Sequence, residues 1–213
     1  MPLPELRLVL AVSLDGRLAP ATGGAAQIGG SGDRRVLEEA LCWADGCLIG
    51  GQTLRLHGTT CQIRAADLLE QREREGRSPQ PVAVVVSQRG QFEPQLRFFS
   101  QPLQRWWLGH SHKEPSPGFD RTLPLPSWPE ALEALAEAGL QRLLVLGGAQ
   151  LAASLLDAQL IDELQLTLCP LLLGGPHSWL PPAARPEPDH WTLKEQRCLE
   201  GDELLLRYRR IRG

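Results

Sequence analysis

A pair of glycines between two apolar runs, Gly147 and Gly148, constrains the fold of this chain more than any other feature. Residues 143–146 read as a strand, a helical pattern follows the glycines, and residues 164–168 alternate as in a second strand. This order is that of a βαβ unit. Glycines let the backbone approach a ligand closely, and the helix after them presents free N–H groups that suit a phosphate or pyrophosphate. The third glycine of the dinucleotide fingerprint is missing, so a plain strand-to-helix joint remains an alternative.

The rest of the chain continues the same alternation of short apolar runs and helical patterns. Ser31 is expected to cap the first helix, and Ser127 with Glu130 forms a capping box before a later one. About eight strands and four helices predict an α/β fold with a mostly parallel sheet, helices on both faces and a C-terminal antiparallel hairpin. Residues 1–213 are expected to form a single domain. Strands are expected at residues 6–12, 47–51, 81–87, 105–108, 143–146, 164–168, 191–199 and 203–211.

Composition excludes several classes of function. The formal net charge is −3, which gives no reason to expect binding to nucleic acid or to an anionic membrane. No apolar run reaches the ~20 residues that span a bilayer, and the first apolar run reads as a strand, not a signal peptide. The five cysteines are odd in number and form no C-x-x-C motif, which is typical of reduced thiols in a cytoplasmic protein.

Motifs for metal binding and nucleophilic catalysis are absent from the sequence. His110 and His112 are two residues apart with no third ligand nearby, so no metal site is expected. No G-x-S-x-G motif occurs. Asp15 follows the first strand, where open α/β sheets bind ligands, although a turn residue needs no further role. Ser87 and the glycine pairs also follow strands, and together these strand ends predict a cleft for a small molecule.

Several motifs in a fixed order resemble a known family. AVSLDGRLA, LIGGQT, LLVLGGAQLAASLL and LIDELQLTLCPLLLGG occur in the order found in the RibD C-terminal family, the reductase of bacterial riboflavin biosynthesis, which is related in fold to dihydrofolate reductase. The resemblance implies a three-layer α/β/α fold, a mixed sheet and a homodimer. It also implies NADPH-dependent reduction of a phosphoribosylamino-pyrimidine, in which hydride is delivered to C1′ of the opened ribosyl group.

The resemblance also assigns the cofactor side of a site. Arg89 lies where a guanidinium could pair with the 2′-phosphate of NADPH, and a solvated turn residue is the alternative. The cofactor positions are Ala11, Ile28, Thr53, Ser87, Arg89, Gly147, Gly148, Ala149, Gln150 and Leu151.

The substrate side departs from the family's pattern. Residues 57–64 stand for its Asp-x-Pro-x-Leu-Thr-x-Arg run, in which His57 replaces the Asp, Cys61 replaces the Leu and only Arg64 is retained. Cys42 stands where the family has an arginine, and Leu146 where it has a glutamate. Each lost charged contact removes ~1.5–3 kcal/mol of binding.

We expect Asp15, His57 and Arg64 to face the substrate, with Asp15 and His57 as the candidate catalytic groups. The alternatives are an NADPH-dependent reductase of another small heterocycle or carbonyl compound, and a non-catalytic dinucleotide-binding protein.

Overall fold

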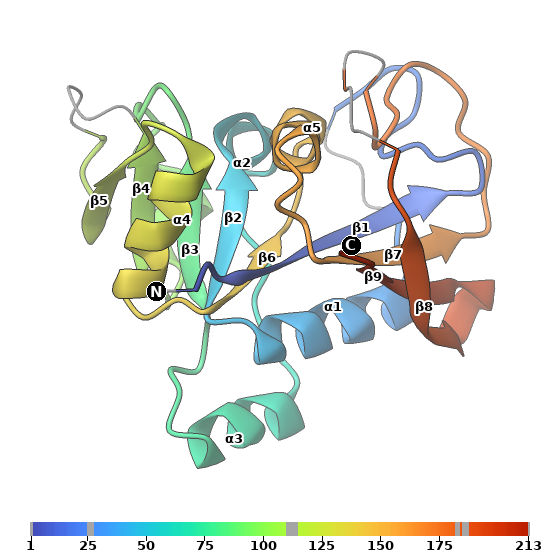
Figure 1. Cartoon of the computed structure of the whole chain (residues 1–213), viewed down its shortest axis with the longest axis horizontal. Coiled ribbons are helices and arrows are strands. Elements are labelled where there is room, and N and C mark those ends of the chain that lie inside the picture. The colour runs from blue at the N-terminus through green and yellow to red at the C-terminus, as the bar shows by residue number, and fades with distance from the viewer. Residues whose placement is uncertain (1, 25–27, 110–114, 182–183, 185–187, 213) are drawn as a thin grey trace. The chain divides into compact units, whose positions relative to one another are not determined.

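The computed structural model describes residues 2–24, 28–109, 115–181, 184 and 188–212. Two compact units can be distinguished along the chain. The first unit comprises residues 1–5 and 38–148, and the second comprises residues 6–37 and 149–213. Nine strands and five α-helices lie within the described residues (Figure 1).

The first unit contains a five-stranded parallel part of the sheet, in the order β5-β4-β3-β2-β6. Each neighbouring pair runs parallel, so the carboxyl ends of all five strands lie at one edge. The central strand β3 has the sequence VAVVV, and its three middle residues are buried, as expected for a strand covered on both faces. The strands are β2 (Gly46–Gly50), β3 (Val82–Val86), β4 (Arg105–Gly109), β5 (Arg121–Pro124) and β6 (Arg142–Val145).

Three helices belong to this first unit: α2 (Gly51–His57), α3 (Ala66–Arg74) and α4 (Trp128–Glu137). Ser127 is confirmed as the cap of α4, because its Oγ accepts a hydrogen bond from the Glu130 amide at 3.4 Å, and its hydroxyl donates to the Glu130 side chain at 3.0 Å. Helix α2 and strand β5 were not expected. Each is short, and each buries too few apolar side chains to show a period in the sequence.

A phenylalanine-rich core lies in the first unit. Phe98 is fully buried, and the Phe99 ring packs edge-on against it with centroids 5.3 Å apart. We call the following set the phenylalanine cluster: Ile49, Leu54, Ala83, Val85, Phe92 and Phe98, with Leu96, Phe99, Leu103, Phe119 and Leu146 packed against it.

The second unit contains β1 (Glu5–Ser13), β7 (Glu163–Cys169), β9 (Leu204–Arg210) and β8 (Trp191–Cys198), in that order, together with α5 (Ala149–Asp157). Strands β1 and β7 are parallel, whereas β7, β9 and β8 pair antiparallel. The expected C-terminal hairpin is therefore confirmed, and so is the mixed, mostly parallel sheet. Among the described residues, no helix is both long and apolar enough to cross a bilayer.

Helix α1 (Ser31–Trp43) corrects one expectation about capping. Ser31 is its first residue and not its N-cap, and the Ser31 hydroxyl donates to Glu200 at 2.7 Å. The amides of Gly30 and Asp33 donate instead to the carboxylate of Glu203, which is distant in the sequence. A local pattern could not show this, because the cap comes from the other end of the chain.

Candidate cofactor site

The paired-glycine bend lies at the carboxyl end of β6. Gly147 and Gly148 have φ values of +106° and +72°, which favour glycine. The Gly147 carbonyl accepts a hydrogen bond of 3.2 Å from the Gly50 amide at the end of β2. A Cβ added at Gly147 would meet nothing within 4 Å, whereas one added at Gly148 would stand 3.0 Å from Thr53 Oγ1. The bend therefore has open space at Gly147 and a close neighbour, Thr53, at Gly148.

Helix α5 begins at Ala149, directly after this bend. The amides of Ala149, Gln150 and Leu151 belong to its first turn, where N–H groups have no carbonyl partner within the helix. The Leu151 side chain is buried and anchors this turn, while Gln150 is exposed. A glycine bend followed by such a turn can hold an anionic group through its amides.

The turn after β3 is built around an arginine that the sequence analysis did not single out. The Arg55 guanidinium donates to the carbonyls of Arg89 and Gln91 at 3.0 Å each and lies 4.5 Å from the centre of the Phe92 ring. The Ser87 hydroxyl donates to the same Arg89 carbonyl at 2.6 Å. The Arg89 side chain is exposed. The backbone of this turn is thus held by Arg55 and Ser87, and the Arg89 side chain is exposed to solvent.

Close approach of Ser87, directly after β3, explains the glycine at the first position of α2. A Cβ at Gly51 would stand 2.6 Å from Ser87 Oγ, so any larger residue there would displace the serine. Gly51, Ser87 and Gly147 all follow parallel strands of the first unit. Thr53, Ser87 and the glycine bend therefore lie at the same edge of the first unit's sheet.

In the second unit, the Asp15 carboxylate links the end of β1 to residues 173–174 through hydrogen bonds. The carboxylate accepts hydrogen bonds from Ser13 Oγ at 2.6 Å and from the amides of Leu173 and Gly174 at 3.0 and 2.8 Å. The Arg17 guanidinium lies 3.5 Å away. These bonds, with that from Ser13 the largest cause, hold the pKa of Asp15 well below its usual range. Asp15 is therefore ionised at neutral pH and accepts hydrogen bonds.

The two cofactor positions predicted in the second unit lie on different elements. Ala11 lies in β1 opposite Thr167 of β7. Of the residues from Leu6 to Ser13 in β1, it is the one that is not buried. Ile28 is half-buried and stands three residues before α1. Both side chains are small or apolar, so they could provide contact surface but no charge.

The segment after α2 leads away from the strand ends. His57 is exposed at the last position of α2, and Gly58 ends that helix in the left-handed conformation. The Thr60 amide then bonds Gln101, and the Ile63 amide bonds Gln80, residues that precede β4 and β3.

Arg64 and Cys61 lie further along this segment. The Arg64 amide is held by Glu38 of α1 at 2.7 Å, and its side chain is exposed. Cys61 is half-buried. Arg64 is thus held beside residues that precede the strands, whereas Ser87 and Gly147 follow them.

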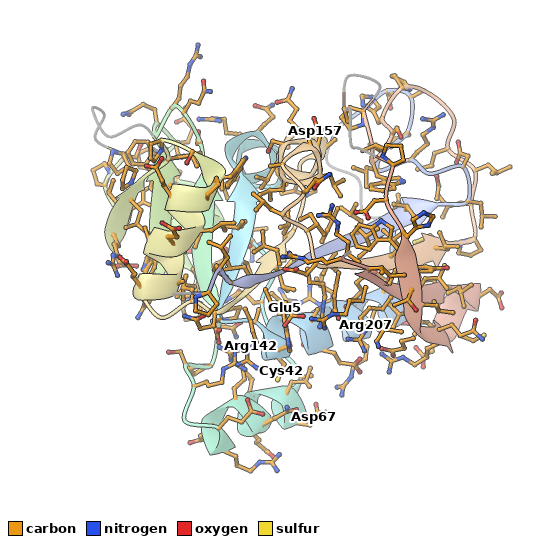
Figure 2. The ribbon with its side chains drawn as sticks, viewed as in Figure 1. Glu5, Cys42, Asp67, Arg142, Asp157 and Arg207 are labelled. Carbon is orange, nitrogen blue, oxygen red and sulfur yellow. The ribbon has the colours of Figure 1, made fainter. Side chains whose placement is uncertain are left out.

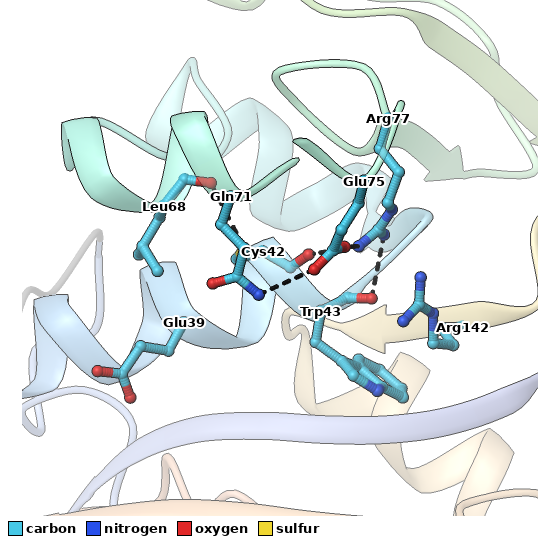
Figure 3. Close-up of a pocket in the computed structure, with 8 residues that line it drawn as sticks. All are labelled: Glu39, Cys42, Trp43, Leu68, Gln71, Glu75, Arg77 and Arg142. Atoms are coloured by element: carbon cyan, nitrogen blue, oxygen red, sulfur yellow. Dashed lines mark hydrogen bonds and ion pairs between the residues drawn. The ribbon is translucent and has the colours of Figure 1, made fainter. Parts of the chain in front are cut away.

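Cys42 is likewise packed away from the bend. It is buried in α1, and its thiol donates to the Leu68 carbonyl of α3 at 3.5 Å. Burial raises the pKa of this thiol. Cys42 and Arg142, which are labelled in Figure 2, both line a pocket of about 190 Å³ between α1 and α3 (Figure 3). The structure does not place Cys42 with Ser87 and the glycine bend, so its role in substrate binding stays a prediction without local support.

Leu146 has an evident role in packing. It is half-buried and packs against the phenylalanine cluster. The position that carries a glutamate in the family pattern is therefore occupied here by an apolar side chain in apolar surroundings.

No cluster of His, Cys, Asp and Glu that could hold a metal occurs in the part of the chain that the structure describes. His110 and His112, the pair considered in the sequence, lie outside the described residues.

Residues 4–202 match the family described as the RibD C-terminal domain. The chain belongs to the RibD C-terminal domain family. This confirms the family expected from the motifs at Asp15, Gly147 and the strand after it.

Curated relatives of this family are similar over most of the chain. A 2,5-diamino-6-ribosylamino-4(3H)-pyrimidinone 5′-phosphate reductase of Archaeoglobus fulgidus is 25% identical over 185 residues, which is 81% of this chain and 83% of the relative. The riboflavin biosynthesis protein RibD of Escherichia coli is 28% identical over 182 residues, 81% of this chain but 50% of the relative. The chain thus spans about half the length of that RibD protein. The family match, together with the name of the Archaeoglobus fulgidus relative, confirms the expected enzyme class, an oxidoreductase of riboflavin biosynthesis.

Among solved structures, RibD of Acinetobacter baumannii is similar with a TM-score of 0.83 and 22% identity, covering 99% of this chain and 59% of that one. This similarity confirms the fold of the RibD C-terminal domain family, the expected relative of the dihydrofolate reductase fold.

Proposed function

We propose that this chain is an NADPH-dependent reductase that acts on a phosphoribosylamino-pyrimidine. The observation that carries the proposal is the paired-glycine bend at Gly147 and Gly148, which precedes the first turn of α5. Membership of the RibD C-terminal domain family supports the same reaction class.

The residues present fit a dinucleotide. A side chain at Gly147 would fill the space beside the bend, and one at Gly148 would press on Thr53, so glycine at both positions leaves that space free. The amides of Ala149, Gln150 and Leu151 would hold the diphosphate, with Ala11 and Ile28 as contact surfaces. When bound, NADPH supplies the hydride for the reaction.

The preference for NADPH over NADH is assigned to the turn after β3. The Arg89 guanidinium is exposed there, and the backbone beneath it is fixed by Arg55 and Ser87. A guanidinium can form two parallel bonds to a 2′-phosphate, which NADH lacks.

The protein's part in catalysis is mainly to bind, orient and exclude water. Asp15 is held as a carboxylate and would accept a hydrogen bond from the substrate or stabilise a neighbouring cation. His57 is exposed and remains the candidate for proton transfer. Arg64 is the retained basic residue proposed to contact the substrate.

Another small heterocycle or carbonyl compound is a second candidate substrate. The observation that favours it is the position of Leu146 in the phenylalanine cluster, where the family pattern has an acidic residue. Burial of Cys42 beneath α3 removes a further polar contact. The third candidate function is that of a non-catalytic protein, which binds the dinucleotide but reduces no substrate.

Titration of the purified chain with NADPH and with NADH tests the cofactor, and the loss of NADPH absorbance with a panel of phosphoribosylamino-pyrimidines tests the reaction. The proposal predicts tighter binding of NADPH and oxidation that depends on one of these pyrimidines. Binding without oxidation by any of them would favour the other candidates, and failure to bind either dinucleotide would overturn the reductase assignment.

We further propose a homodimer in the cytoplasm. Strand β8 ends the sheet of the second unit, six of its eight residues are exposed, and Leu193 retains 45% of its accessible surface. An exposed edge strand of this kind readily pairs with another chain. None of the five cysteines, all of which the structure describes, forms a disulfide, which suits a reducing compartment. Light scattering of the purified chain would give the mass of a dimer, and the mass of a monomer would contradict this part of the proposal.

A further inference from the structure

Glu203 stands immediately before β9 and connects two distant parts of the chain. Its Oε1 atom accepts a hydrogen bond of 2.6 Å from the Gly30 amide, and its Oε2 atom accepts one of 2.7 Å from the Asp33 amide. The side chain belongs to a residue with only 4% of its surface exposed. One buried carboxylate therefore fixes the backbone on both sides of the first residues of α1.

The surrounding backbone is packed closely enough to leave little freedom. A Cβ at Gly32 would stand 2.7 Å from the Leu199 Cβ and 2.9 Å from the Glu200 carbonyl oxygen. The Ser31 hydroxyl adds a hydrogen bond of 2.7 Å to the Glu200 carboxylate. Residues 29–33 thus rest on the turn formed by residues 199–203, and we call this arrangement the loop seat.

The loop seat lies in surroundings that strengthen its hydrogen bonds. Burial is the largest cause that raises the pKa of Asp33, the charge of Glu203 raises it further, and Thr167 and Arg34 oppose the shift. The pKa of the Cys169 thiol is raised to about 12, again first by burial and then by Glu203 and Asp33. The hydrogen bonds from the amides of Gly30 and Asp33 to Glu203 are partly buried, and a hydrogen bond in such surroundings is stronger than one in water.

We propose that Glu203 is a positioning residue, whose carboxylate fixes the backbone at Gly30 and so holds Ile28, two residues earlier, in place for NADPH. Ile28 stands two residues before Gly30, whose amide is fixed. Without this bond the two glycines that follow Ile28, Gly29 and Gly30, would give its backbone little stiffness. The inference rests on the proposed function, because it assigns the purpose of the loop seat to cofactor binding.

The chemistry of the side chain makes the proposal testable with a small change. A carboxylate accepts at both oxygens, whereas a glutamine amide has one acceptor and presents donors at its nitrogen. Glu203→Gln keeps the size of the side chain but must lose one of the bonds to Gly30 and Asp33. Glu200→Gln is the matched control, because it changes a neighbouring carboxylate that bonds the same segment only through the exposed Ser31 hydroxyl.

The first measurement is the hydrogen exchange of the Gly30 and Asp33 amides. Loss of one charge-assisted bond should accelerate exchange at these amides about 10-fold in Glu203→Gln and leave it unchanged in Glu200→Gln. The second measurement compares NADPH with adenosine 2′,5′-bisphosphate, which carries the 2′-phosphate but no nicotinamide. Glu203→Gln should weaken NADPH about 10-fold and leave the fragment unchanged, because the fragment is assigned to Ser87 and Arg89.

The outcomes separate this inference from the proposed function. If the unaltered chain binds no NADPH, the proposed function fails. In that case, unchanged exchange at the Gly30 and Asp33 amides in Glu203→Gln would also overturn the inference. Faster exchange at these amides would instead support the loop seat. If the chain binds NADPH and Glu203→Gln binds it equally well, Glu203 does not position the segment. Equal weakening of NADPH and the fragment would point to general unfolding and would overturn the inference as well.

Discussion

The hydroxyl oxygen of Thr53 lies 3.0 Å from the point at which a side chain on Gly148 would begin. This relationship brings the start of α2 next to the bend after β6. Since Gly148 also has φ +72°, both the backbone conformation and the space require glycine.

Gly148→Ala should therefore impair both folding and cofactor binding. The left-handed conformation costs an alanine about 1–2 kcal/mol, and the contact with Thr53 adds to this. NADPH affinity should fall by at least about 10-fold, which calorimetric titration would measure.

Gly139→Ala provides a control for backbone strain in the same unit. Gly139 has φ +93° and no atom within 4 Å of an added Cβ, and it follows α4, away from the bend. It should lose a similar amount of stability in urea unfolding and keep its NADPH affinity. Equal affinity in the two variants would show that the bend at Gly148 does not contact the cofactor.

Replacing Arg89 should change the choice of cofactor and leave the fold intact. Its side chain is exposed, and only its backbone carbonyl is used by Ser87 and Arg55. Arg89→Gln should weaken NADPH by ~1.5–3 kcal/mol, the value of a charge-assisted hydrogen bond, with NADH affinity unchanged. If Arg89→Gln still prefers NADPH over NADH, Arg89 does not bind the 2′-phosphate and is only a solvated turn residue.

Asp15 gives the chain a predictable response to acid. Its pKa is lower in the folded state than the ~3.9 of an unfolded aspartate, so the folded state binds the proton less readily. This stabilisation is complete above about pH 4 and is lost as the pH falls through the folded-state value. In urea unfolding at a series of pH values, Asp15→Asn should show a shallower loss of stability below pH ~4 than the unaltered chain. Parallel curves would mean that the bonds from Ser13, Leu173 and Gly174 do not form in solution.

Glu163 should be the most costly carboxylate to remove from the second unit. It is 3% exposed and accepts from Arg7 Nε at 2.8 Å, while Arg209 lies 3.3 Å from its other oxygen. Glu163→Gln leaves the buried Arg7 charge without this carboxylate, which should cost about 3 kcal/mol.

Glu195→Gln is the matched control, because Glu195 is one-third exposed and bonds Arg207 at the surface of the hairpin. Its loss should cost less than about 1 kcal/mol. Similar unfolding free energies for the two variants would contradict a buried ion pair between β1 and β7.

The parts of the fold that followed from the sequence are those with a strong local signal. Strand β3 is a run of β-branched residues, and α4 has a capping box at Ser127, so both were located within a residue or two. Helix α2 has only two buried residues, and the cap of α1 comes from Glu203, about 170 residues away. Neither a short helix nor a distant cap leaves a periodic pattern.

The candidate site divides in the same way. Glycine bends at Gly147 and Gly51 follow from the sequence because positive φ or close approach selects one residue type. Arg55 was missed because its role is to bind the carbonyls of a turn more than thirty residues away. The neighbours of Cys42 and Leu146 depend on packing against α3 and the phenylalanine cluster, which a motif comparison does not show.

Hydrogen exchange of the unaltered chain with and without saturating NADPH tests most directly whether the glycine bend holds the cofactor's diphosphate. The account predicts that NADPH slows exchange at the amides of Gly148, Ala149, Gln150 and Leu151, and that NADH at equal saturation protects the same amides but not the turn at Arg89. Protection elsewhere in the chain, with exchange at these four amides unchanged, would contradict it.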